Sequence, residues 1–174
     1  NRKSWPLHIA LHGHGGGQSG RVACRRYWKG EPAHAGVILA CPDLRSKWTS
    51  ARGEKLVIAT YKDVQRRMNV RTDRVSLGGF SGGGIGTWII GPKYPDLFSA
   101  IVPRAGIPPR ADEAIANLNG LSVYLVHGIG DATIPVKHSR TAVRALERHK
   151  IDHTYRTIST NINRFVKSMW NAII

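Results

Sequence analysis

Acidic residues are scarce in this sequence of 174 residues, which has 11 Asp and Glu against 26 Lys and Arg and a formal net charge of +15. The sequence isoelectric point is about 10.6. Such a charge attracts anions, including nucleic acids and acidic polymers. The basic residues are nonetheless scattered, with Arg25-Arg26 and Arg66-Arg67 as the densest pairs. Because no long basic run or nucleic-acid motif is present, we expect no specific nucleic-acid partner.

Long apolar segments and cysteines are also few. No apolar run approaches the roughly 20 residues of a membrane-spanning helix, so we expect no membrane span. Only Cys24 and Cys41 are present, and Cys41 ends a predicted buried strand, so we expect two free core thiols rather than a disulfide framework. The first six residues carry no apolar signal core, which leaves a secreted and a cytoplasmic location both open. The length predicts one domain, residues 1–174.

Short apolar runs bounded by turn residues alternate with helix-like stretches. Helices are predicted at residues 54–68 and 137–149, where apolar residues recur at helical spacing. The strand-like runs are residues 7–11, 37–40, 75–77, 100–102, 123–126 and 154–158. This alternation predicts an α/β fold with a doubly wound, mostly parallel sheet flanked by helices. Residues 105–120 are too few for a large lid, and chemistry should collect at the carboxyl ends of the strands.

The run Gly79-Phe80-Ser81-Gly82-Gly83 matches the pattern G-x-S-x-G between a predicted strand and a helix-like segment. This is the context of a nucleophile elbow, in which a sharp turn exposes the serine hydroxyl. Side chains two residues before and two residues after the serine would collide with neighbouring elements, which explains the glycines. We therefore predict Ser81 as the nucleophile.

A second glycine-rich turn, His12-Gly13-His14-Gly15-Gly16-Gly17, follows the first predicted strand. Its backbone N–H groups are unobstructed, so His14 or Gly15 is expected to supply one donor of an oxyanion hole and Gly82 the other. His12 is expected to be structural. A metal site made of His12, His14 and His34 lacks a recognised ligand spacing, and we predict no metal or other cofactor.

With these two motifs, the chain resembles the α/β-hydrolase superfamily, in its branch of small carboxylesterases, phospholipase/carboxylesterase-like proteins and feruloyl-esterase or depolymerase-like enzymes. The segments Cys41-Pro42-Asp43, Tyr94-Pro95-Asp96-Leu97-Phe98 and His127-Gly128-Ile129-Gly130-Asp131 add to this resemblance. The resemblance implies that Asp131 is the acid of a catalytic triad, which would orient an imidazole and stabilise its charged form. A loop aspartate that caps the following helix is the alternative for Asp131, and His127 is expected to be structural.

The resemblance breaks at the triad histidine. The position expected to hold it, beyond the last predicted strand, is occupied by Asn163. An amide has no nitrogen that accepts a proton near neutral pH, so Asn163 cannot act as the base. His138, His149 and His153 would each need a different chain path, and solvated positions are the simpler expectation for them. Residues 159–174 still suggest a closing amphipathic helix.

Three functions therefore remain open. The first is a serine hydrolase that acts on small-molecule or polymeric carboxylic esters through Ser81, Gly82, the His14 loop and Asp131, with an unassigned base. The second is a catalytically impaired relative that keeps the fold and serves as a binding protein. The third is a peptidase of the same fold, because substrate choice depends on loops that the pattern does not resolve.

Overall fold

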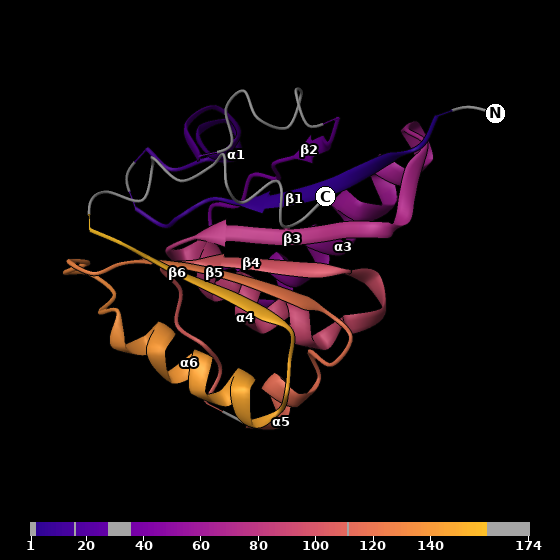
Figure 1. Ribbon diagram of the computed structural model, residues 1–174. Helices are drawn as coiled ribbons and strands as arrows, with labels where there is room; N and C mark the ends of the chain where they lie inside the picture. The colour runs from indigo at the N-terminus through magenta and orange to yellow at the C-terminus, as the bar shows by residue number, and fades with distance from the viewer. Residues whose placement is uncertain (1–2, 16, 28–35, 111, 160–174) are drawn as a thin grey trace.

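The computed structural model describes residues 3–15, 17–27, 36–110 and 112–159. A six-stranded sheet forms the centre of the fold (Figure 1). All neighbouring strands run parallel, in the order β2-β1-β3-β4-β5-β6. The strands are β1 (Trp5–Leu11), β2 (Ile38–Ala40), β3 (Val70–Phe80), β4 (Ala100–Arg104), β5 (Ser122–Gly128) and β6 (His153–Ile158). Each of the six predicted strands is therefore confirmed, and the sheet is the predicted α/β architecture.

Helices connect the strands and cover the sheet. They are α1 (Gly20–Val22), the π-helical turn η1 (Ala23–Tyr27), α3 (Ala51–Arg67), α4 (Gly82–Ile90), α5 (Asp112–Ala116) and α6 (Lys137–Arg148), with short 3-10 turns η2 (Gly91–Lys93) and η3 (Pro95–Leu97). Helix α3 begins three residues before its predicted start because the Ser50 hydroxyl caps it, accepting a hydrogen bond from Gly53 N at 3.2 Å. Between β4 and β5 the described residues hold only α5, so no large lid is present there.

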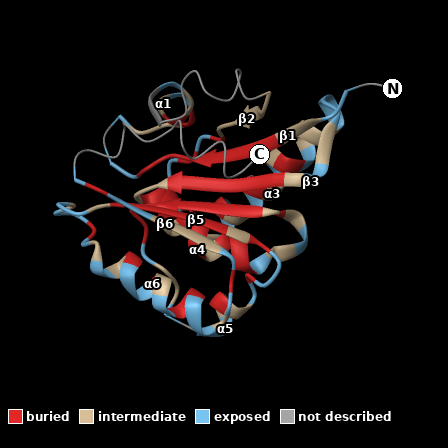
Figure 2. Cartoon of the chain, in the orientation of Figure 1, coloured by how far each residue is buried: buried red, intermediate tan, exposed pale blue. Residues whose placement is uncertain are grey.

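Strand alternation divides the core between the two faces of the sheet. Leu7, Ile9 and Leu11 of β1 point to the larger apolar cluster, which includes residues of α3, α4 and α6. Ala10 points to the other face, where a smaller cluster includes Ala23 of η1. Figure 2 shows the central strands buried along most of their length. Two covered faces explain why these strands read as short continuous apolar runs.

The cysteine prediction is wrong. Cys24 and Cys41 form a disulfide, with their Cα atoms 5.9 Å apart, a separation within the usual range for this bond. The chain returns from the loop after β1 through η1 and so brings Cys24 beside the end of β2. A contact between two such segments is not visible in local sequence patterns.

The register of the strands places their carboxyl ends at one edge. Phe80 pairs with Arg104, and Arg104 pairs with Val126. The segments that follow β1, β3 and β5 therefore emerge at the same edge of the sheet, and these segments carry the predicted site residues. The predicted closing helix covers residues 159–174, of which only Ser159 is described, and the triad position Asn163 lies outside the described residues.

Candidate active site

Ser81 stands in the sharp turn between β3 and α4. Its backbone has φ 54° and ψ −116°, a left-handed conformation that costs about 1–3 kcal/mol for a residue with a side chain. Its N–H donates to Arg104 O at 2.9 Å, and its carbonyl accepts from Ile85 N at 2.9 Å. The Ser81 hydroxyl does not cap α4. The turn therefore fixes the serine backbone while leaving its hydroxyl out of the helix cap.

The glycines around Ser81 are required by close backbone packing. A Cβ atom on Gly79 would lie 2.5 Å from the Gly83 carbonyl, and one on Gly83 would lie 2.2 Å from Leu11 O. Neither approach is possible for real atoms. The predicted reason for glycine two residues before and two residues after Ser81 is thus visible in the geometry.

The loop after β1 is held by His12, which is buried. Its Nδ1–H donates to Gly13 O at 2.7 Å, and its Nε2 accepts from Leu44 N at 3.1 Å. The Trp48 indole N–H donates to His12 O at 2.8 Å, and the two rings stack edge to face. Both imidazole nitrogens are occupied, so His12 is a structural residue of this loop, as the sequence predicts.

The same loop lies directly against the serine turn. A Cβ on Gly13 would lie 3.6 Å from Ser81 Cβ, and a Cβ on Gly82 would lie 2.4 Å from His14 Nδ1. Burial, the neighbouring His12 and the charge of Lys47 lower the pKa of His14, in that order. Gly15 follows with a φ of +115° that favours glycine. The fold therefore brings together His14, Gly82 and Ser81, and places Gly15 next in the same loop.

Asp131 lies in the loop after β5, with 17% of its side chain exposed. Its Oδ1 accepts from Thr133 N and Ile134 N, both at 2.9 Å. The carboxylate therefore organises its own loop rather than capping α6, whose N-cap residue is Val136. Two strand spacings, about 10 Å, separate β5 from β3 in the sheet. Asp131 thus follows the carboxyl end of β5, on the edge of the sheet that carries Ser81.

His127 is the imidazole nearest Asp131 among the described residues, with Nε2 3.6 Å from Oδ2. It is fully buried. Its Nε2–H donates to Ile134 O at 2.7 Å, and its Nδ1 accepts from the Ser139 hydroxyl at 2.5 Å. These bonds hold the imidazole within the acid loop. His127 is therefore structural, as expected.

Two of the substitute bases weighed from sequence lie at the wrong end of the sheet. His153 begins β6 and pairs in register with Val123, five residues before Gly128, so it lies about 16 Å along the strands from the carboxyl edge. His149 ends α6 and contacts the Asp112 carboxylate at 2.8 Å. His138 lies in the first turn of α6, on the acid side of the edge. Neither His149 nor His153 can serve Ser81.

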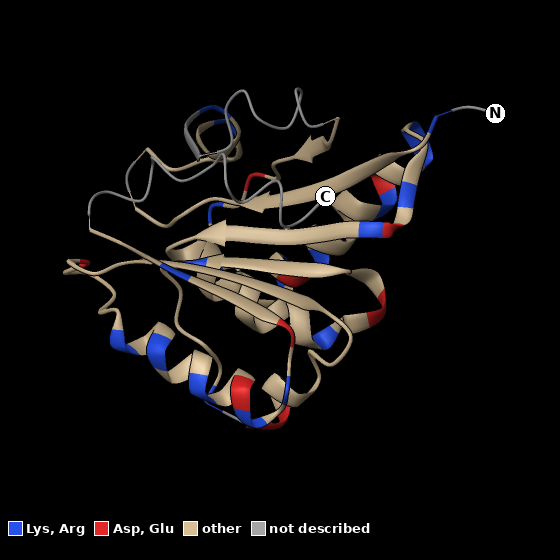
Figure 3. Ribbon diagram, viewed as in Figure 1, with Lys and Arg blue, Asp and Glu red and all other residues tan. Residues whose placement is uncertain are grey.

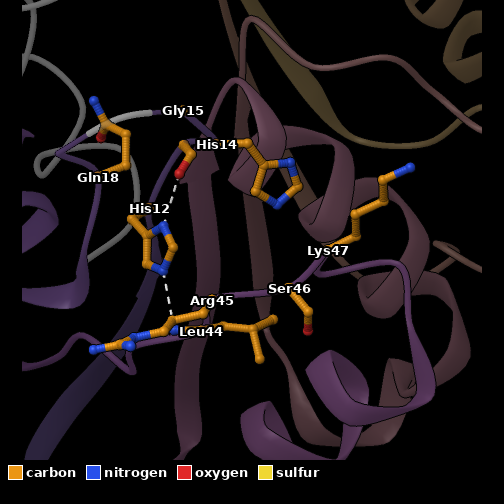
Figure 4. A pocket seen from close by; sticks show the side chains of 9 residues that line it. His12, His14, Gly15, Gln18, Leu44, Arg45, Ser46 and Lys47 are labelled. Carbon is orange, nitrogen blue, oxygen red and sulfur yellow. Dashed lines mark hydrogen bonds between the residues drawn. The ribbon is translucent and has the colours of Figure 1, made fainter.

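A cavity that the sequence did not reveal adjoins the His14 loop (Figure 4). Its volume is about 400 Å³, and its lining residues are His12, Gly13, His14, Gly15, Gln18, Leu44, Arg45, Ser46 and Lys47. In the sequence, only the position of residues 44–47, soon after the carboxyl end of β2, indicated that they could lie near the site. Within the described ranges, no three His, Cys, Asp or Glu side chains gather as metal ligands would, and no helix there is long and apolar enough to cross a bilayer.

A parallel sheet with a serine in a strained strand-to-helix turn, next to a glycine-rich loop, defines the α/β-hydrolase fold. Residues 49–173 match the Phospholipase/Carboxylesterase family. Because the match covers most of the chain, the protein belongs to this family. No curated protein matches the sequence.

Solved structures show the same fold. Esterase PE8 is 20% identical with a TM-score of 0.78, covering 98% of this chain and 94% of its own. The fluorophosphonate-binding serine hydrolase FphF of Staphylococcus aureus is 14% identical with a TM-score of 0.81, covering 99% of this chain and 84% of its own. A thermostable esterase is 20% identical with a TM-score of 0.72, covering 96% of this chain, which spans only 48% of that esterase. The neighbours therefore show the α/β-hydrolase fold, and the family match gives the class of phospholipases and carboxylesterases.

Proposed function

We propose that the protein hydrolyses carboxylic esters with Ser81 as the nucleophile. The observation that carries this proposal is the strained turn at Ser81, which presents the hydroxyl beside a glycine-rich loop at the start of α4. A strain of this kind persists only where the surrounding packing enforces it, and it is typical of functional sites. The esterases among the structural neighbours support the reaction class.

In this proposal, Ser81 attacks the ester carbonyl and the developing oxyanion is bound by backbone N–H groups of Gly82 and of His14 or Gly15. The first N–H groups of a helix lack partners within the helix and face negative charge favourably. Asp131 is the acid that orients the base. The base itself is unassigned, because Asn163 occupies its expected position.

A catalytically impaired binding protein is the second candidate, and one observation favours it. Among the described residues, the imidazole closest to Asp131 is His127, and both its ring nitrogens are engaged, by Ile134 O of the acid loop and by the Ser139 hydroxyl of α6. Losing the base of a triad removes most of the catalytic power, which leaves about 10³–10⁴-fold catalysis over water from the oxyanion hole and binding.

The deciding experiment measures labelling by a fluorophosphonate probe and turnover of 4-nitrophenyl acetate, with Ser81→Ala as the control. Labelling and turnover that vanish in Ser81→Ala support the esterase. An inert wild type and a clear gain of turnover in Asn163→His support the impaired relative. Parallel assays with an N-acyl 4-nitroanilide, an amide, distinguish a peptidase.

A further inference from the structure

We propose that Arg45 and Lys47 form a subsite for a negatively charged group of the substrate, so that the preferred substrate is an ester bearing a free carboxylate. This inference rests on the proposed ester hydrolysis and specifies its substrate class. It is carried by the cavity beside the His14 loop, by the charges that line it and by the packing of its lining residue Gly13 against Ser81.

The cavity is lined by the loop that packs against the nucleophile. Gly13 is one of its lining residues, and a Cβ on Gly13 would touch Ser81 Cβ at 3.6 Å. The opposite wall is the segment after β2, from Leu44 to Lys47. Two hydrogen bonds hold this segment to His12, one from Leu44 N to Nε2 and one from the Trp48 indole to the carbonyl. A volume of about 400 Å³ falls within the range of small-molecule sites. A substrate whose carbonyl reaches Ser81 can therefore extend into this cavity.

The charges in the cavity have one sign. Arg45 and Lys47 are its two charged lining residues, and within the described part of the chain neither forms an ion pair with a carboxylate. Lys47 acts on the site itself, since its charge helps to lower the pKa of His14. Figure 4 shows the Lys47 side chain on the side of the His14 ring, and the Arg45 side chain extending in another direction on the side of the His12 ring.

The basic character continues past the cavity. A neighbouring hollow of about 550 Å³ shares Leu44 and Arg45 with it and adds Arg52 and Lys55. Asp43, which also lines this hollow, is 63% exposed; its carboxylate lies 3.5 Å from the His12 ring and 3.4 Å from Gly20 N. A cleft lined mainly by one sign of charge raises the local concentration of oppositely charged substrate. An anionic ester would therefore be drawn toward Ser81.

The test compares matched esters on the wild type and on Arg45→Gln/Lys47→Gln. Mono-4-nitrophenyl adipate against 4-nitrophenyl hexanoate places the carboxylate on the acyl side, and 4-acetoxybenzoate against 4-tolyl acetate places it on the alcohol side. We expect the wild type to favour the anion of at least one pair, and the double variant to lose about tenfold in kcat/KM for that anion. For the neutral esters, kcat/KM in the double variant should differ from the wild-type value by less than about twofold.

The control variant is Arg144→Gln/Lys150→Gln, which removes the same charge from the exposed surface of α6 and the turn that follows it; Figure 3 shows this basic surface along α6, away from β1 and β2. It should retain the anion preference, and added salt should weaken that preference in the wild type. Equal hydrolysis of charged and neutral esters would overturn the proposal, and so would a preference that survives in Arg45→Gln/Lys47→Gln.

A binding measurement separates failure of the subsite from failure of the proposed hydrolysis. Calorimetric titration of Ser81→Ala protein with monoethyl adipate should show binding that disappears when Arg45 and Lys47 are also replaced by Gln. If the wild type hydrolyses no ester but this binding persists, the subsite stands and the esterase proposal fails. If the wild type hydrolyses neutral esters but shows neither this binding nor a preference for anionic esters, the esterase proposal stands and the subsite proposal fails.

Discussion

On the nucleophile side of the site, backbone packs directly against backbone, whereas the acid side is held by hydrogen bonds, among them two to one carboxylate. A Cβ on Gly83 would lie 2.2 Å from Leu11 O, but a Cβ on Gly128 would meet its nearest atom at 3.9 Å, and one on Gly130 would meet none within 4 Å. The acid loop depends instead on Asp131, which accepts two backbone N–H groups. Steric fit therefore fixes the nucleophile, whereas hydrogen bonds fix the acid loop.

This difference makes Asp131 the residue whose replacement should have the largest effect. In Asp131→Asn the amide oxygen can keep both backbone hydrogen bonds, but the charge that would stabilise an imidazolium is lost. On the proposed function, we expect kcat for 4-nitrophenyl acetate to fall by about 10³–10⁴-fold, with the free energy of unfolding nearly unchanged.

Asp131→Ala is the companion variant, because it removes the loop hydrogen bonds as well. It should also lower the free energy of unfolding, by about 1–2 kcal/mol in urea denaturation. Wild-type kcat in Asp131→Asn would show that the carboxylate serves only to hold the loop.

Two glycine substitutions test the packing side of the comparison. Gly83→Ala forces a methyl group against Leu11 O and His12 O, which belong to the backbone and cannot rotate away. We expect it to lower the free energy of unfolding by about 3 kcal/mol. Gly130→Ala places the same methyl group in open space on the acid loop, and should change stability by less than about 0.5 kcal/mol. If urea denaturation gave equal losses of unfolding free energy in Gly83→Ala and Gly130→Ala, the nucleophile side would not be more tightly packed than the acid side.

The same contrast explains what the sequence could predict. The six strands follow from short apolar runs, because both sheet faces are covered. Gly79 follows from a contact within one strand-turn-helix unit, with Gly83, and Gly83 itself packs against the end of β1. The disulfide of Cys24 and Cys41, the bond from Trp48 to His12 and the cavity at Arg45 join segments that are distant in sequence. Their residues carry no local pattern, and only the packed chain brings them together.

Another predicted effect concerns a buried histidine beside the strand that carries the nucleophile. His8 of β1 lies at 2.8 Å from the Ser76 hydroxyl, and its ring would be 2.7 Å from a Cβ on Gly78. Burial, helped by the charge of Arg104, lowers the pKa of His8 from 6.5 to about 3. Between these two values the unfolded chain binds a proton that the folded protein does not. Stability is therefore full above pH 6.5 and falls by about 1.4 kcal/mol per unit as the pH drops toward 3.

His8→Asn tests this assignment because an amide can still pair with the Ser76 hydroxyl but does not titrate. Urea denaturation between pH 6 and pH 5 is the informative measurement, since the carboxylates with lowered pKa values titrate below this window. The dependence of unfolding free energy on pH should be less steep in His8→Asn by about 1.4 kcal/mol per unit. Identical slopes in the wild type and in His8→Asn would mean that groups other than the His8 imidazole cause the dependence of the unfolding free energy on pH.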